Sequence, residues 1–289
     1  MYVQTGYVRN YGFEAMLSYG HRWGDFGWDS SFTFSANKNE IVELVKDYVH
    51  PETGKTYNVD KLELKTDEGR GFGKAKFILK EGGTLGDLYT HADLKRDING
   101  NVLIDDSGNV TAIDNAGDIK LGSVLPKANL AWNNSFSYKG INAGFLLTAR
   151  LGGIVYSATQ AYLDLYGVSE TSAAARDAGG VWINGRSRVN PQSFYEVVAS
   201  QSGLPTYYTY SATNLRLQEA HIGYTIPRRW LGNVCDINVS LVGRNLWMIY
   251  CKAPFDPEAV ATTNNYYQGI DYFMMPSTRN IGFNIKINF

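Results

Sequence analysis

The last stretch of the chain, residues 279–289, alternates strictly between two kinds of side chain. Ile281, Phe283, Ile285, Ile287 and Phe289 are large and apolar, whereas the residues between them are small or polar. Successive side chains of a β-strand point to opposite faces, so this stretch predicts a strand with one apolar and one polar face. Such a strand packs its apolar face either on a soluble core or on the lipid of a membrane β-barrel.

Six earlier segments repeat this alternation. In the fifth, the apolar phase shifts between Leu217 and Ala220, which predicts a β-bulge near Gln218 and Glu219. The only helix that the pattern predicts is a short one around 172–177. The six segments are 13–19, 28–35, 130–138, 141–151, 214–224 and 237–244.

The connections between these segments alternate in length, and this separates the two readings. Outer-membrane barrels have short periplasmic turns and long extracellular loops, whereas a soluble sandwich has no reason to sort its loops. Charged residues also avoid the apolar faces, as expected if those faces meet lipid. We therefore predict an all-β fold, a partial transmembrane antiparallel β-barrel with long extracellular loops. The short connections are 23–27, 138–141 and 226–235, and the long ones are 36–127, 152–212 and 247–278.

Composition excludes several other classes of function. The 27 basic and 28 acidic residues give a net charge of −1, which provides no electrostatic basis for binding nucleic acid. The 20 Tyr, 13 Phe and 6 Trp suit barrel girdles and sugar-binding surfaces. Cys235 and Cys251 are too few for a disulfide framework and lack metal-ligand spacing. No catalytic constellation stands out, so we expect neither an enzyme nor a cofactor.

One acidic run, Asp97 to Asp106, has oxygen-bearing side chains at several positions, as calcium loops do. It lacks the third acid and the turn glycine of such loops, since Asn101 and Val102 occupy those positions, and no Glu closes it. A hairpin turn at Asn99-Gly100 is the better explanation, with a calcium site as the alternative.

Several motifs resemble those of one family. Leu241-Val-Gly-Arg-Asn-Leu-Trp247 is followed by Ala253-Pro-Phe-Asp-Pro-Glu258, and then by Pro276-Ser-Thr-Arg-Asn-Ile-Gly-Phe283. Together they resemble the C-terminal portion of SusC/RagA-type TonB-dependent outer-membrane transporters. Further pieces fit in the same order, among them Asn10 to Glu14 and Gly223 to Pro227.

The resemblance implies a function and a set of partners. It implies energy-coupled import of oligosaccharides or peptides across the outer membrane of a Gram-negative cell. The implied partners are a SusD-like surface lipoprotein, the TonB complex, the barrel-assembly machinery and outer-membrane lipid. Plugged transporters of this kind have about 22 strands. We therefore expect residues 1–289 to be a C-terminal barrel segment without the plug domain and the N-terminal strands, and TonB to engage that missing part.

Aromatic and polar residues in the long loops are the candidates for substrate binding. Aromatic rings stack on the C–H faces of sugars, while polar neighbours hydrogen-bond the hydroxyls. The alternative is that these residues pack the loops together. The candidates are Trp182, Arg186, Tyr195, Tyr207, Tyr208, Tyr266, Tyr267 and Asp271.

The C-terminal strand carries a second candidate role. A terminal aromatic on an alternating strand is similar to the signal that the barrel-assembly machinery reads, so we expect Phe283, Ile285, Ile287 and Phe289 to form such a signal. Two alternatives to a transporter remain at this point. One is a secreted or surface carbohydrate-binding β-sandwich without transport activity, and the other is an adhesin-like barrel.

Overall fold

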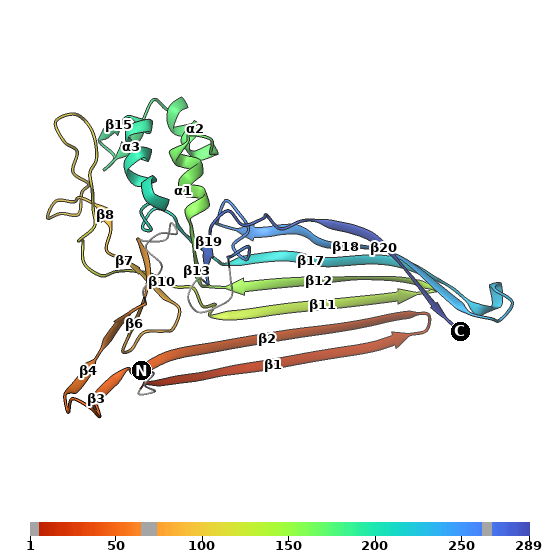
Figure 1. Cartoon of the computed structure of the whole chain (residues 1–289). Helices are drawn as coiled ribbons and strands as arrows, with labels where there is room; N and C mark the ends of the chain where they lie inside the picture. Colours follow the sequence, from red (N-terminus) through yellow and green to blue (C-terminus); the bar gives the residue numbers. More distant parts are fainter. Residues whose placement is uncertain (1–5, 65–73, 262–267) are drawn as a thin grey trace.

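The computed structural model describes residues 6–64, 74–261 and 268–289. All seven predicted strands are present and form one antiparallel sheet, in which each strand pairs with the next along the order β1-β2-β11-β12-β17-β18-β20 (Figure 1). Their bounds are β1 Tyr7–Trp23, β2 Phe26–Glu43, β11 Ala128–Tyr138, β12 Ile141–Leu151, β17 Asn214–Ile226, β18 Asp236–Cys251 and β20 Asn280–Asn288.

Cross-strand register aligns the predicted faces into continuous rows. Residues directly opposite each other in a ladder share a face, and one row of the sheet is apolar from β1 to β18. It consists of Leu17, Phe32, Trp132, Leu147, Leu217 and Trp247. A neighbouring row on the other face is polar and consists of Glu14, Ser35, Asn129, Arg150 and Asn214.

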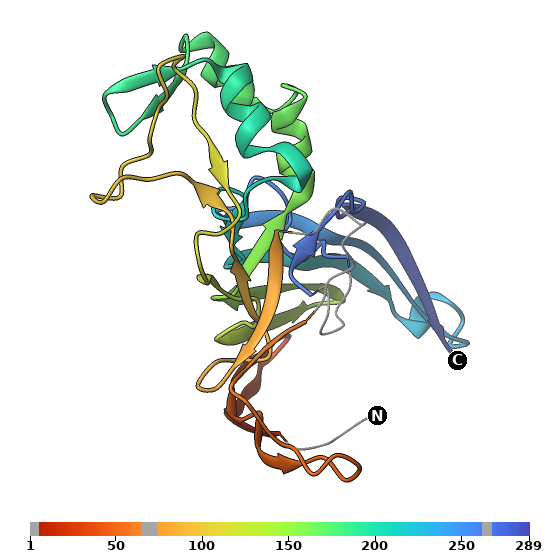
Figure 2. The same ribbon diagram turned by 60° about the vertical axis from the view of Figure 1, so that its left-hand side comes forward.

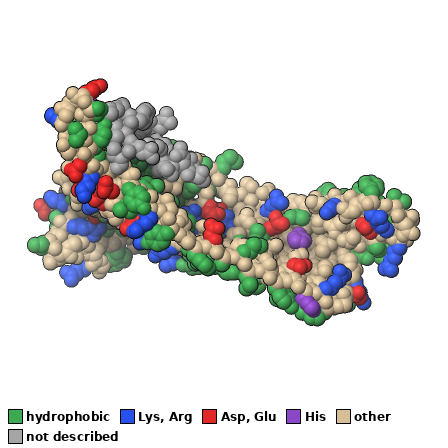
Figure 3. All heavy atoms as spheres, turned by 90° about the horizontal axis from the view of Figure 1, so that it is seen from below, with side chains coloured by type: hydrophobic (Ala, Val, Ile, Leu, Met, Phe, Trp, Pro, Cys, Tyr) green, Lys and Arg blue, Asp and Glu red, His purple; other side chains and the backbone are tan. Residues whose placement is uncertain are grey.

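The apolar face of the sheet is largely uncovered. Leu17 is 74% exposed and Trp247 61%. Where polar side chains do occur on this face, neighbouring tryptophans bond to them: Trp28 Nε1 donates to Asn134 Oδ1 at 3.1 Å, and Trp132 Nε1 donates to Ser30 Oγ at 3.0 Å. Seen from below, charged side chains lie across the broad surface of the sheet region while hydrophobic ones gather along its outline (Figure 3).

The predicted bulge lies at Gln218. Leu147 pairs with Leu217 and Leu146 with Glu219, so Gln218 is the extra residue. The pairing of β17 with β18 also shifts between Leu217 and Glu219, but there β18 contributes the additional residue, since the partners are Trp247 and Arg244. One inserted residue restores the apolar phase, so Leu217 and Ala220 both lie on the apolar face.

The two ends of the sheet differ in their connections, and the sheet is curved between them. The three short connections lie at one end, and the long ones lead to a body of helices and small sheets at the other end (Figures 1 and 2). Three strands are much longer than predicted: β1 begins at Tyr7, β2 continues to Glu43 and β18 continues to Cys251. Polar residues in these extensions interrupt the apolar alternation, and pairing with the neighbouring strands decides their structure.

The long connections are folded rather than irregular. The first contains a four-stranded sheet with the order β10-β7-β6-β5 and two hairpins, β3–β4 and β8–β9. Its strands are β3 Val45–Val49, β4 Thr56–Val59, β5 Lys61–Glu63, β6 Ala75–Lys80, β7 Asp87–Thr90, β8 Asp93–Leu94, β9 Ala112–Ile113 and β10 Ile119–Ser123.

The second long connection contains the helices. Ser157, Ser169 and Asn190 cap the N-termini of α1, α2 and α3 by accepting hydrogen bonds from backbone N–H groups, which satisfies donors that a helix start leaves free. Only α2 was predicted from the sequence. The elements are β13 Ile154–Ser157, α1 Ala158–Leu165, α2 Glu170–Asp177, β14 Val181–Ile183, β15 Ser187–Val189, α3 Pro191–Val198, η1 Ser200–Ser202 and β16 Thr209–Ser211. Outside this connection, η2 is Arg228–Trp230 and β19 is Ile270–Asp271.

The hydrophobic core belongs to this end body and not to the sheet. Phe77 and Leu88 from the first long connection, Tyr156 and Leu204 from the second, and Ile270 from the third are all fully buried in one cluster. The three long connections therefore fold together on one core. None of the helices among the described residues is long and apolar enough to cross a membrane.

The acidic run forms two tight turns. Asp97 Oδ1 accepts hydrogen bonds from the backbone N–H groups of Asn99 and Asn101, each at 2.8 Å, and Asp105 repeats the arrangement with Ser107 and Asn109. A hydrogen bond from the Asn101 side-chain amide to Asp97 Oδ2, together with these backbone hydrogen bonds, lowers the pKa of the Asp97 carboxyl. Its oxygens therefore brace a turn, as the hairpin explanation predicts. The described residues contain no group of three or more His, Cys, Asp or Glu side chains placed to hold a metal ion.

Candidate functional site

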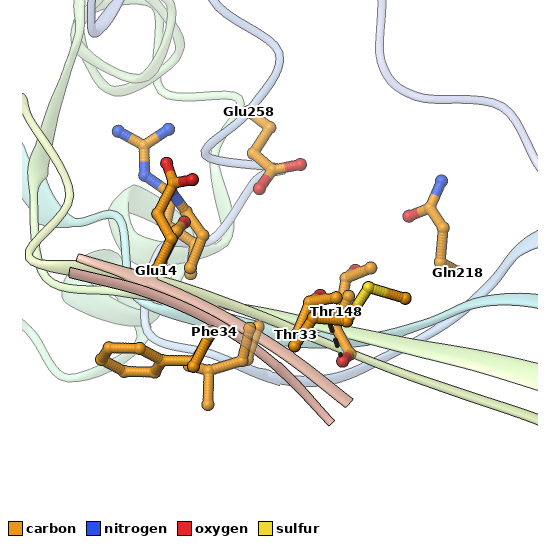
Figure 4. A pocket seen from close by; sticks show the side chains of 14 residues that line it. Glu14, Thr33, Phe34, Thr148, Gln218 and Glu258 are labelled. Atoms are coloured by element: carbon orange, nitrogen blue, oxygen red, sulfur yellow. Dashed lines mark hydrogen bonds between the residues drawn. The ribbon is translucent and has the colours of Figure 1, made fainter. Parts of the chain in front are cut away.

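The polar face of the sheet contains a hollow of about 810 Å³ beneath the end body. In Figure 4, Glu14, Gln218 and Glu258 lie on one side of the sheet, whereas Phe34 points to the other. Glu258 comes from the connection after β18, which crosses above the strands. The lining comprises Glu14, Ala15, Met16, Thr33, Phe34, Ser35, Asn129, Leu130, Ala131, Thr148, Ala149, Arg150, Gln218 and Glu258.

Both signs of charge line this hollow. Glu14 and Arg150 project from the same polar row of the sheet, and Glu258 enters from above. The Arg150 guanidinium donates from Nη2 to the backbone oxygen of Val124 at 2.7 Å. Its Nε is buried and has no acceptor among the described residues. This N–H is therefore a hydrogen-bond donor without an acceptor at the wall of the hollow.

A buried ion pair fixes the connection that carries Glu258. Arg216, in β17, donates from Nη2 and Nη1 to the two carboxylate oxygens of Asp256, at 2.7 and 3.2 Å. Its Nη2 also lies 3.3 Å from Glu258 Oε2, and Asn214 Nδ2 donates to Glu258 Oε1 at 3.3 Å. Bidentate Arg–carboxylate pairs are strong and directional, so residues 253–258 are held against the sheet.

The charge state of Asp256 follows from the same contacts. Burial favours the neutral acid, but hydrogen bonds from Arg216, Ser277 and the Glu258 backbone outweigh it and hold the carboxyl pKa below its ordinary value. Asp256 is therefore ionised at neutral pH.

The hollow provides reversible polar contacts and no reactive centre. Its carboxylates, amide, hydroxyls and guanidinium are hydrogen-bonding groups, and its lining contains no Cys, His or Lys. The only charged acceptors in the lining are Glu14 and Glu258, placed around Arg150. Such a wall suits transient binding of a polar solute or of a polar protein segment.

The predicted substrate-binding residues divide into two groups. Trp182 is 54% exposed and stacks on the Arg188 guanidinium at 4.4 Å, and Arg186 is exposed in the adjoining turn. Tyr207 is half-buried, and Tyr195 is buried in α3. Tyr266 and Tyr267 lie outside the described residues.

Two of the candidates are hydrogen-bonded inside the end body. Tyr208 donates its hydroxyl to Asp164 Oδ2 at 3.0 Å, and burial raises its pKa. Asp271 is buried and accepts a hydrogen bond from Ser157 Oγ at 2.6 Å. For Tyr195, Tyr208 and Asp271 these surroundings favour the packing alternative, whereas Trp182 and Arg186 stay open to a ligand. None of these candidates lines the polar hollow.

The C-terminal strand is fully exposed along its length. Phe283, Ile285 and Ile287 lie on the apolar face opposite Leu241, Val239 and Ile237 of β18. Phe289 follows the strand and is 85% exposed. Their role as an assembly signal stays a prediction.

Comparison with known proteins relates this arrangement to one group. No family model matches the chain. TonB-dependent receptor P3 of Formosa agariphila is 25% identical over 91% of this chain and 27% of its own length. TonB-dependent receptor P26 of the same organism is 25% identical over 99% of the chain and 29% of its length.

Solved structures show the same fold. The RagAB peptide transporter matches 98% of this chain and 30% of its own with a TM-score of 0.65 at 18% identity. A "closed-closed" state of the RagAB peptide importer matches equally, at 17% identity. These comparisons confirm the resemblance to SusC/RagA-type TonB-dependent receptors. The chain spans less than a third of the length of these proteins. They are receptors and transporters, not enzymes, as was expected of this chain.

Sequence reasoning missed the most constrained part of the site. It placed the charged residues of the strands away from the apolar faces but gave no sign that Asp256 and Glu258 meet Arg216, 40 and 42 residues earlier in the chain. A usable signal was present: two acids that flank Pro257 and one arginine on a strand next to a predicted bulge.

Proposed function

We propose that this chain is a wall segment of an energy-coupled outer-membrane transporter, and that it imports oligosaccharides or peptides together with parts not contained in residues 1–289. The sheet spans the membrane with its apolar face on lipid and its polar face on the lumen. The mechanism is reversible binding at the outer side followed by TonB-driven movement of a plug, with no covalent chemistry.

The observation that carries this proposal is the uncovered apolar face. Its rows are continuous over seven strands, and no second sheet packs on them within the described parts of the chain. Exposing that much apolar surface to water is unfavourable, whereas contact with hydrocarbon requires it. The same observation disfavours the carbohydrate-binding sandwich, which has to bury one face of each sheet.

The open edges of the sheet complete the argument. In the described structure, β1 and β20 each pair on one side only. Unpaired backbone groups are not tolerated in hydrocarbon, so barrels close. We propose that further strands, from the same polypeptide or another chain, close this sheet into a barrel. The polar face of the sheet then lines the lumen and contacts the plug.

The orientation follows from the connections. Because the long connections share one end of the sheet and the short ones the other, the end body faces outward and the short turns face the periplasm. In fold, the chain is similar to the RagAB peptide transporter. We propose that a SusD-like lipoprotein covers the end body here, with Trp182 and Arg186 among the groups available to substrate.

Uptake by the encoding bacterium tests this function. We expect deletion of the complete gene to abolish growth on one class of oligosaccharide or peptide as sole carbon source, and loss of TonB to have the same effect. Re-expression of the complete gene restores growth. Unchanged uptake on all substrates in both deletion strains would rule out energy-coupled import.

A further inference from the structure

A second hollow, of about 910 Å³, opens within the sheet itself. The pairing of β2 with β11 ends at Ser35 and Asn129, yet β2 continues to Glu43. From there the two strands separate toward the end body (Figure 1). The groove thus lies where β2 and β11, the second and third strands of the sheet, separate.

The groove has apolar walls. Tyr11 and Phe13 of β1 line one side, and both are on the apolar face of the sheet and about half exposed or more. Leu125, Pro126 and Ile154 line the opposite side. The groove therefore adjoins the surface that meets lipid, at the end of the sheet that bears the long connections.

Positive charge flanks these walls. Lys38 and Lys127 both line the groove, and none of its lining residues is acidic. Lys38 Nζ lies 5.5 Å from the centre of the Tyr11 ring, and the Arg9 guanidinium lies 5.7 Å from it. The carboxylate of Glu40 pairs with Arg9 at 3.1 Å and lies 4.0 Å from Lys38 Nζ.

Three of the uncharged polar side chains of the groove, those of Asn39, Thr84 and Ser123, are already hydrogen-bonded. The Asn39 amide donates to Asn10 and accepts from the Leu85 backbone, both at 2.8 Å. Thr84 Oγ1 bonds to Asp87 at 2.7 Å and to Ser123 at 2.9 Å. Few hydrogen bonds are left for the hydroxyls of a sugar or the backbone of a peptide. An apolar chain with an anionic end fits the remaining chemistry better.

We propose that this groove holds an acyl chain of a phosphorylated glycolipid of the outer leaflet, with its phosphate between Lys38 and Lys127. The inference rests on the proposed function, because it requires the end body to face outward. Lysines near a membrane surface attract anionic headgroups, and aromatic residues at that level mark the boundary between lipid and water.

Lipid binding to the complete protein, purified from outer membranes in detergent, tests the inference. The probe is bisphosphorylated lipid A, and native mass spectrometry counts the bound molecules. We expect the double variant K38Q/K127Q to weaken binding about 30-fold. Ala36 also lines the groove, and A36F, which fills it, should weaken binding of every acylated probe.

The control variant K46Q/K55Q removes the same charge at exposed positions outside the groove lining. It should bind lipid A as the unmodified protein does. Binding of dephosphorylated lipid A should not depend on Lys38 and Lys127. Wild-type affinity in K38Q/K127Q would overturn the inference, as would equal binding of phosphatidylglycerol, which would identify a nonselective anionic-lipid surface.

Failure of the inference can be told apart from failure of the proposed function. Lipid contact of the sheet is tested separately, by cysteine labelling of the same complete protein in outer membranes before detergent is added. If the apolar face is shielded by lipid but lipid A binding ignores the groove variants, only the groove assignment fails. If the apolar face is not in lipid, the proposed function and this inference fall together.

Discussion

Arg216 of the central sheet holds Asp256 by a bidentate ion pair, with N–O distances of 2.7 and 3.2 Å. The pair joins two segments 40 residues apart and fixes the connection between β18 and β20 on the polar face. Both side chains are largely buried, at 6% and 10% exposure. Because Arg216 Nη2 also lies 3.3 Å from Glu258 Oε2, the position of Glu258 in the hollow depends on Arg216 as well.

We therefore expect R216A to release residues 253–258 and to destabilise the protein. Removing one partner of a buried ion pair costs about 3–5 kcal/mol because it leaves a buried charge unpaired. The matched control is R244A, whose ion pair with Glu219 is at the surface and is worth about 0–1 kcal/mol. Denaturant unfolding and hydrogen exchange at 253–258 measure both effects. Equal losses in the two variants would contradict this role for Arg216.

The attachment of this connection should also depend on pH. The pKa of the Asp256 carboxyl is below its ordinary value in the folded protein, so its contribution to stability is present above the unfolded pKa, about 3.9, and is lost as pH falls through the folded pKa. Protease protection of residues 253–258 should stay constant from about pH 7 to 5 and decline below about pH 4. D256N should show weak protection without this decline, and a decline near neutral pH would assign the effect to another group.

The bulge at Gln218 makes a prediction about deletions. Removing Gln218 should leave every apolar side chain of β17 on the apolar face, because it is the extra residue in the pairing with β12. Removing Asn238 from the regular pairing of β18 should instead move one part of that strand to the wrong face. Folded, protease-resistant protein in the outer membrane is the readout. Similar yields of the two deletion variants would contradict the bulge assignment.

Two adjacent positions of β18 should differ sharply in how well they tolerate a charged side chain. Leu241 lies on the apolar face opposite Ile222 and Phe283, whereas Ser240 lies on the polar face. An arginine on the lipid side costs about 2–4 kcal/mol at the membrane midplane. We expect L241R to lower the free energy of unfolding by about this amount and S240R to leave it nearly unchanged. Urea titration in lipid vesicles measures both, and an equal loss in S240R would argue against a wet polar face.

The sheet could be predicted from sequence because each of its strands has its own signal. Alternation along residues 130–138 and 141–151 fixes which side chains share a face, and the phase slip at Gln218 marks the bulge without knowledge of any partner strand. The family motifs then indicated the larger fold to which such a sheet belongs.

The end body could not be predicted in this way. Its strands are two to six residues long and its three helices have eight residues each, about two turns, so their periodicity is weak and only the region of α2 gave a helical signal. Their structure depends on burial of residues such as Tyr156, Leu204 and Ile270 in one shared core. The Arg216–Asp256 pair and the groove at Lys38 arise in the same way, from segments that meet only in the folded chain.

The most direct test of the lipid-facing sheet is cysteine labelling in intact outer membranes of cells that make the complete protein. After C235S and C251S, single cysteines are introduced as S240C and L241C and treated with a charged maleimide. We predict rapid labelling of S240C from the aqueous lumen and strong protection of L241C by lipid. Equal labelling of the two positions, or protection of S240C with labelling of L241C, would contradict a membrane-spanning sheet with its apolar face on lipid.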